Sequence, residues 1–153
     1  MLVYPDLFDT AVLETHIERL ERLTPATVPQ WGEMTAPAML AHLNVCYEMV
    51  YESKHPRPNP IMRWVLKTIV KQKVVGPAPY ARSTPTAPAF RIKGERDFAV
   101  EQARLIAYMR RVQQEGRTRF EGRESASFGP LTAHEWNVLF AKHLGHHLQQ
   151  FGV

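Results

Sequence analysis

The sequence TAHEWNVLFAKHLGHHLQQF, residues 132–151, carries the clearest structural signal in the chain. Thr132 and Glu135 have the spacing of a capping box, in which each side chain accepts a hydrogen bond from the backbone N–H of the other residue. The stretch therefore predicts an amphipathic helix that follows Thr132 and runs to Gln150. Its apolar residues recur with the spacing of one helical face: Trp136, Phe140, Leu144 and Phe151.

The same periodicity appears in three further stretches, at residues 9–23, 35–53 and 98–116. Thr35 is a suitable N-cap for the second of these helices, Thr24-Pro25 ends the first, and Gly116 ends the third. Four amphipathic helices of this length predict an all-α fold, a four-helix bundle with one additional short helix and a long crossover. The length of 153 residues is that of a single domain, and we assign residues 1–153 to it.

The additional short helix is expected at residues 61–75, where it has an apolar and a basic face. We expect the apolar face to pack on the core: Trp64, Val65 and Ile69. We expect the basic face to be solvated: Arg63, Lys67 and Lys71. The crossover that follows, residues 76–93, should be irregular because prolines interrupt both helices and strands.

The net charge of +4 comes from one segment of the chain. Residues 54–93 contain nine Lys or Arg and no Asp or Glu, and the remaining residues have a net charge of minus five. This basic segment could hold an anionic partner. It lacks the aromatic interleaving and the helix-turn-helix, zinc-finger or RRM motifs of nucleic-acid binding proteins, so we expect no specific nucleic-acid partner.

Cysteine content and hydropathy favour a cytoplasmic location. The chain has one cysteine, Cys46, and its N-terminus lacks the basic start and apolar run of a secretion signal. The longest apolar stretch without charges, residues 34–47, is shorter than the roughly 18 to 20 residues that cross a bilayer. We therefore expect no membrane span.

Two histidines of the C-terminal helix are candidate metal ligands. His143 and His147 lie one helical turn apart beside the apolar face, so their side chains can converge on one point. His146 points further towards solvent and is not expected to be a ligand. A metal ion would satisfy both buried imidazoles, although hydrogen bonds to carbonyl groups or water would also do so.

A third ligand can come from the helix at residues 35–53, where His42 lies beside the apolar stripe. Antiparallel packing would bring His42 to the histidine pair, with ring nitrogens within roughly 4 Å of one another. Three imidazoles leave a coordination position for water or substrate and suit nickel, zinc or iron. The residues between His143 and His147 include no glutamate, so the zinc-protease motif is absent and protease activity has no support.

Several blocks of the sequence closely resemble an uncharacterised bacterial family of DinB-like proteins. The resemblance covers essentially the whole chain and is carried by residues 31–36, 39–43, 128–132, 135–136 and 142–152. It implies a four-helix bundle, frequently dimeric, with one histidine of the second helix and a His-x-x-x-His pair of the last helix as nickel or zinc ligands. The matching positions in this chain are His42, His143 and His147.

The resemblance also implies chemistry at the metal. Some relatives use such a site for thiol-dependent transfer or isomerisation, so a low-molecular-weight thiol is a possible cosubstrate. We therefore expect a small-molecule hydrolase or a thiol-dependent transferase, in which the ion activates water or a thiol. Two other interpretations remain open: a non-catalytic binding module that uses residues 54–93, and an ion that only stabilises the fold.

Other residues near these histidines are weaker candidates for a metal ligand or a catalytic base. Cys46 follows His42 by one turn and could be a soft fourth ligand, but an inert core thiol is the more common case. Glu48 and Glu101 could act as bases or support the ligands, yet most glutamates on helix faces are only solvated, and we assign neither a role.

Overall fold

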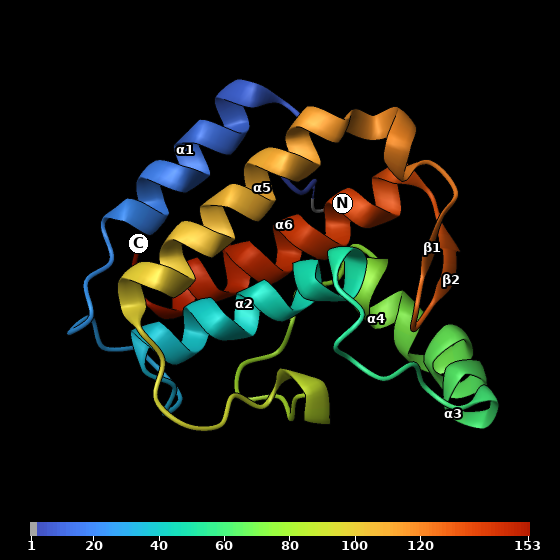
Figure 1. Ribbon diagram of the computed structural model, residues 1–153, viewed down its shortest axis with the longest axis horizontal. Helices are drawn as coiled ribbons and strands as arrows, with labels where there is room; N and C mark the ends of the chain where they lie inside the picture. The colour runs from blue at the N-terminus through green and yellow to red at the C-terminus, as the bar shows by residue number, and fades with distance from the viewer. Residues whose placement is uncertain (1–2) are drawn as a thin grey trace.

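The computed structural model describes residues 3–153, and helices make up most of it (Figure 1). Four long helices, α1, α2, α5 and α6, lie along one another and form a bundle, so the predicted all-α fold class is confirmed. The elements in chain order are α1 (Thr10–Glu21), α2 (Ala36–Tyr51), α3 (Pro60–Val65), the π-helical turn η1 (Leu66–Val70), α4 (Lys71–Val75), the 3-10 turn η2 (Pro88–Phe90), α5 (Phe98–Phe120), β1 (Arg123–Ser125), β2 (Gly129–Leu131) and α6 (Ala133–Gln150).

Each long helix begins at a polar side chain that caps its first turn. Asp9, Thr35 and Asp97 accept hydrogen bonds from backbone N–H groups in the first turns of α1, α2 and α5. At α6 the predicted capping box of Thr132 and Glu135 is confirmed, with both reciprocal hydrogen bonds present. A cap of this kind contributes about 1 kcal/mol to helix stability. These caps fix the starts of α2 and α6, the helices that carry the candidate ligands.

The hydrophobic core lies between the four long helices. Tyr47 of α2 stacks on Phe140 of α6, with ring centroids 4.7 Å apart, and Phe140 also stacks on Trp136. Every long helix contributes fully buried leucines, including Leu20, Leu40, Leu105 and Leu148. This packing sets α2 against α6 and thereby determines which of their side chains meet.

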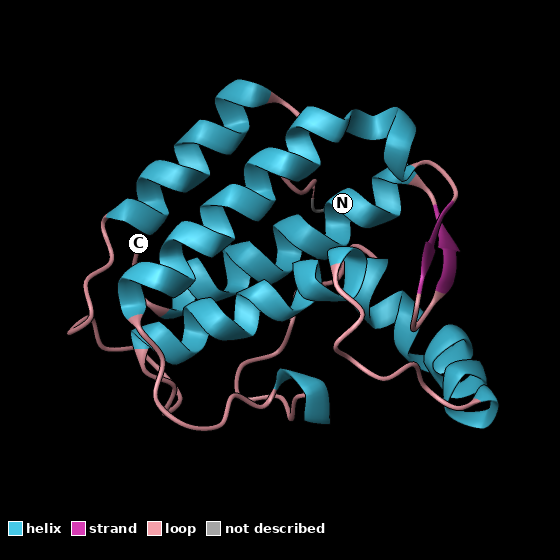
Figure 2. Cartoon of the chain, in the orientation of Figure 1, coloured by secondary structure: helices cyan, strands magenta, loops and turns pink. Residues whose placement is uncertain are grey.

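Two details after Gly116 differ from the sequence prediction. Gly116 has a left-handed backbone (φ 73°) that breaks α5, but one more helical turn follows and ends at Phe120. That turn forms because Phe120 is fully buried against Phe8, Trp136 and Phe140. A two-stranded antiparallel hairpin, β1 and β2, then leads into α6 (Figure 2), where the sequence pattern predicts no strands. Strands of three residues are too short to produce a recognisable alternation.

The expected orientation of the helix at residues 61–75 is wrong. Trp64 and Ile69 are exposed and Val65 is only half-buried, whereas Arg63 and Lys71 of the basic side contact the protein and Lys67 is exposed. Arg63 pairs with Glu124 of β1, and Lys71 pairs with Glu135 of α6. The C-terminal end of the segment reaches the core through the buried Val75, and ion pairs bind Arg63 and Lys71 to the hairpin and to α6, so Trp64 and Ile69 are left in solvent.

The crossover at residues 76–93 is irregular, as predicted, apart from the turn η2. Its start is held by the buried ammonium of Lys142, which donates hydrogen bonds to the backbone carbonyls of Lys73, Gly76 and Ala78. Burial lowers the pKa of Lys142 to about 8, so the group remains largely protonated at neutral pH. Lys142 precedes His143 in α6 and thus ties the crossover to the helix that carries two of the candidate ligands.

Candidate functional site

The packing of α2 against α6 brings His42, His143 and His147 together, as the sequence predicted. One potential ligand atom from each residue lies within 4.8 Å of the other two, slightly wider than the roughly 4 Å expected. The Nε2 atoms of His42 and His143 are 2.8 Å apart, and the centroids of the His42 and His147 rings are 4.7 Å apart. All three side chains are buried. The cluster could hold a metal ion.

Neighbouring groups determine which nitrogen of His42 and His147 carries the proton. The Nδ1 of His42 lies 2.9 Å from the carbonyl oxygen of Phe90, which can only accept, so His42 donates from Nδ1. The Nδ1 of His147 lies 2.7 Å from Oε1 of Gln150, while the amide nitrogen of Gln150 donates to the Trp31 carbonyl. The carboxamide is therefore oriented to accept a hydrogen bond from His147. In both rings Nε2 retains its lone pair.

His143 connects His42 to Cys46 through its two ring nitrogens. Its Nε2 must donate to Nε2 of His42, because that atom carries a lone pair and lies at hydrogen-bond distance. The Nδ1 of His143 then accepts from the Cys46 thiol, whose sulfur lies 3.0 Å away. A metal ion bound by the three Nε2 atoms would replace the His143 Nε2 proton. The outer atom of each ring already has a partner, which is how ligand histidines are commonly held.

The electrostatics of the cluster favour neutral imidazoles. Burial lowers the pKa of His143 well below the usual value, and the neighbouring His147 and His42 lower it further. Burial, with the nearby His42, lowers the pKa of His147 to about 3, and burial also lowers the pKa of His42. Neutral imidazole is the form that binds metal, so these side chains are ready to act as ligands at neutral pH.

Two aromatic residues of the crossover lie against the histidines. The Phe90 ring is 5.4 Å from the ring of His42 and 5.8 Å from that of His143, measured between centroids. Tyr80 lies 6.4 Å from the His143 ring and 5.8 Å from the His146 ring. The crossover thus forms an aromatic cover over the histidine cluster.

The remaining sequence candidates lie outside the cluster. His146 is half-buried rather than turned to solvent, and its ring packs against Trp31, Tyr80 and His147. Cys46 contacts the outer nitrogen of His143, away from the point where the Nε2 atoms meet, and burial raises its pKa to about 12. Glu48 and Glu101 are buried in ion pairs with Arg104 between α2 and α5. These carboxylates stabilise the bundle.

Sequence reasoning missed three residues that contact the histidines. Gln150 lies three positions after His147 on the same helix, so helical spacing was a usable signal. Phe90 and Tyr80 lie in an irregular segment with no periodicity, and nothing in the sequence indicates that they reach α2 and α6. Their positions follow from the path of the crossover.

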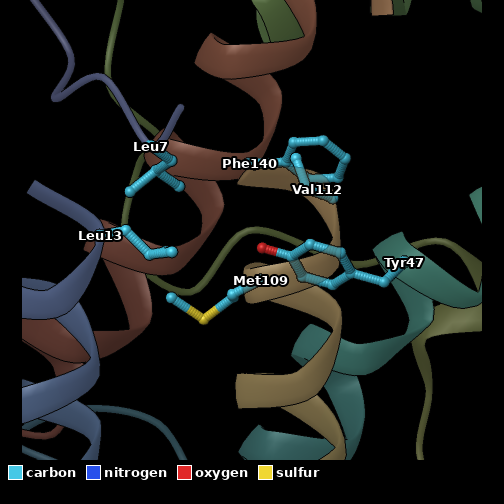
Figure 3. A pocket seen from close by; sticks show the side chains of 6 residues that line it. All are labelled: Leu7, Leu13, Tyr47, Met109, Val112 and Phe140. Carbon is cyan, nitrogen blue, oxygen red and sulfur yellow. The ribbon is translucent and has the colours of Figure 1, made fainter. Parts of the chain in front are cut away.

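A small apolar cavity lies in another part of the core (Figure 3). The Tyr47 hydroxyl points into this cavity. None of the three histidines lines this cavity. The residues that line the cavity are Leu7, Leu13, Tyr47, Met109, Val112 and Phe140.

The fold and the site define an all-helical protein with a buried cluster of three histidines able to hold a metal ion. A family model described as "Protein of unknown function (DUF1569)" matches residues 6–152, so the chain belongs to this family. No curated protein and no solved structure matches the chain significantly.

The hydrogen bond from His147 to Gln150 provides a test of how the ligands are held. Replacing Gln150 with alanine removes the acceptor that fixes the His147 ring, so Ni²⁺ or Zn²⁺ affinity should fall about tenfold. Gln149→Ala is the matched control, because Gln149 is exposed on the same helix. Competition titration with a chromophoric chelator measures both affinities. Equal losses in the two variants would contradict the assigned role of Gln150.

Proposed function

We propose that residues 1–153 form a single DinB-like domain that binds one divalent metal ion through His42, His143 and His147. One observation supports this proposal above all: each of the three rings has a partner at Nδ1, the Nε2 atoms of His42 and His143 are 2.8 Å apart, and one ring nitrogen from each histidine lies within 4.8 Å of the other two. This arrangement fits the donor set of a three-histidine site. Nickel or zinc suits three imidazole ligands best, both by ligand chemistry and by the resemblance to DinB-like proteins.

We propose that the ion serves a small-molecule hydrolase or a thiol-dependent transferase. The ion would supply Lewis acidity towards water or a low-molecular-weight thiol. The protein holds the three imidazoles neutral and oriented, and Phe90 and Tyr80 limit the access of bulk water. Because both aromatic residues belong to the crossover, this segment would also select the substrate.

The resemblance to DinB-like proteins adds two elements to the proposal. It implies a homodimer, which light scattering of the purified protein tests. We also place the protein in the cytoplasm, where a reduced Cys46 is expected. Among residues 3–153, no helix is long and apolar enough to cross a membrane.

Metal analysis of the purified protein tests the proposed site. The chain should be produced without a polyhistidine tag and purified without immobilised-metal resin, because either can introduce metal. We expect about one Ni²⁺ or Zn²⁺ per chain by mass spectrometry, removable by a strong chelator. Protein that contains no metal and fails to bind added Ni²⁺ or Zn²⁺ would refute the site.

Thiol consumption then tests the catalytic proposal. The metal-loaded protein is incubated with glutathione or cysteine and a panel of small electrophiles, and ester hydrolysis is measured in parallel. Chelator-treated protein is the control for both assays. Activity that depends on metal supports an enzyme. A metal-loaded protein without either activity, whose unfolding temperature falls sharply on chelation, would instead indicate an ion that stabilises the fold.

A further inference from the structure

The segment formed by α3, η1 and α4 has an exposed apolar face. Its residues have the spacing of one side of a helix, and Figure 1 shows α3 at the opposite end of the molecule from α1. The side chains on this face that are at least half exposed are Ile61 (79%), Met62 (50%), Trp64 (64%) and Ile69 (57%). An exposed apolar face that includes a tryptophan is typical of a binding surface.

The ion pairs of the opposite side hold this face outward. Arg63 is bound to Glu124 in the hairpin, and Lys71 is bound to Glu135 at the start of α6, at 2.8 Å. Turning the apolar face towards the bundle would break both pairs. Ile61, Trp64 and Ile69 are therefore exposed to solvent.

Basic residues lie in the same stretch of the sequence as the apolar face, and one of them, Lys67, lines a hollow together with Trp64. Within residues 3–153, Arg57, Lys67 and Lys73 form no ion pair, and all three are exposed. The whole segment 54–93 contains no Asp or Glu. A shallow hollow beside the face combines the ammonium of Lys67 with apolar walls, next to the ion pair of Arg63 with Glu124, and its lining residues are Pro58, Pro60, Arg63, Trp64 and Lys67. The hollow offers positive charge to a phosphate group next to an apolar contact.

We propose that the segment α3–α4 binds the surface of an anionic lipid membrane. Ile61, Trp64 and Ile69 would enter the boundary between headgroups and acyl chains, while Arg57 and Lys67 contact lipid phosphates. An apolar face beside basic residues is the pattern of helices that lie in the membrane interface. Tryptophan is enriched at that depth.

The charges favour a lipid surface over a second copy of the chain. In a two-fold symmetric dimer formed through this face, each copy would place Arg57, Lys67 and Lys73 near the same residues of the other copy. The carboxylates that contact the segment, Glu124 and Glu135, are already paired with Arg63 and Lys71. An anionic membrane supplies both the apolar environment and the opposite charge.

Vesicle sedimentation with the full chain tests the proposal. Vesicles of phosphatidylcholine with about one third phosphatidylglycerol should sediment the protein, whereas pure phosphatidylcholine vesicles should bind it at least about tenfold more weakly. Raising the salt from about 50 mM to about 500 mM should weaken binding to the anionic vesicles. Equal binding to both vesicle types, or no binding to either, would overturn the proposal.

Two pairs of double variants assign the binding to this face. Ile61→Ser/Ile69→Ser should weaken vesicle binding at least about tenfold, whereas Val28→Ser/Val100→Ser, at two other exposed apolar positions, should change it less than about twofold. Lys67→Gln/Lys73→Gln should also weaken vesicle binding at least about tenfold, whereas its control, Arg22→Gln/Arg119→Gln, should change vesicle binding less than about twofold. The second variant of each pair changes residues that are also exposed but lie outside the segment.

Metal content, circular dichroism and oligomeric state separate membrane binding from damage to the fold and from self-association. All four variants should keep the metal content and circular dichroism of the parent, because none of the substituted residues touches the histidine cluster or the core. Equal weakening by the control variants would overturn the assignment to this face. A concentration-dependent dimer that Ile61→Ser/Ile69→Ser abolishes, without vesicle binding by the parent, would show that a second copy covers the face.

Discussion

Replacing His143 with alanine should weaken Ni²⁺ or Zn²⁺ binding at least about 100-fold while the protein stays folded. The ring of His143 contacts both other rings of the cluster, those of His42 and His147. Without it, two imidazoles remain, and two ligands hold a divalent ion weakly. Isothermal titration of chelator-treated protein measures the affinity, and circular dichroism measures the helical content.

The fold should survive this substitution because the core around His143 is extensive. The variant loses the hydrogen bonds to His42 and Cys46, which together contribute a few kcal/mol at most. The stacked rings of Tyr47, Trp136 and Phe140 and the capping box of α6 are unaffected. His146→Ala is the matched control, because His146 is adjacent in the same helix but outside the ligand set.

Each result with the His143 variant has a definite meaning. Loss of metal binding with an intact helical spectrum supports a site that the folded bundle positions in advance. Unchanged metal affinity would show that the three histidines do not form the site. Loss of the fold together with the metal would indicate a structural ion and would remove the main argument for an enzyme.

The second large effect is acid destabilisation of the metal-free protein. The pKa values of His42, His143 and His147 are lower in the folded state than the ordinary value of 6.5, mainly because the rings are buried. Below pH 6.5 the unfolded chain therefore binds more protons than the folded protein, so stability falls as the pH falls. The contribution of the three neutral histidines to the free energy of unfolding is fully present above pH 6.5. For His147 it is lost progressively down to about pH 3.

The expected slope follows from the number of histidines involved. Each group contributes about 1.4 kcal/mol per pH unit at most, so three groups together give up to about 4 kcal/mol per unit below pH 6.5. Urea unfolding of chelator-treated protein at pH 7.0, 6.0 and 5.5 measures the slope. His143→Ala should show a shallower dependence because one of the three groups is gone.

His134→Gln is the control for the pH experiment. It removes a histidine that is exposed at the start of α6 and lies outside the cluster, so the slope that comes from the three buried histidines should remain. A flat dependence in the parent between pH 7.0 and 5.5 would contradict the buried neutral state of the cluster.

Local patterns in the sequence determined the main helices and pointed to the three histidines of the candidate site. Helix α6 was predictable because its capping box and apolar periodicity depend only on residues near one another in the chain. The convergence of His143 and His147 follows from helical geometry alone. His42 could be added because antiparallel packing of two amphipathic helices leaves few arrangements of their apolar faces. The resemblance to DinB-like proteins pointed to the same residues.

Only the tertiary structure decided what surrounds these residues. The contact of His42 with the Phe90 carbonyl joins residues 48 positions apart through a crossover without periodicity, so no local pattern encodes it. The outward apolar face at Trp64 depends on Glu124 and Glu135, two partners that lie far along the chain. An amphipathic pattern indicates only that a helix has one apolar and one polar face. Which face packs depends on the core surface that the other helices leave uncovered and on charged residues far along the chain. Both are in place only once the bundle has formed.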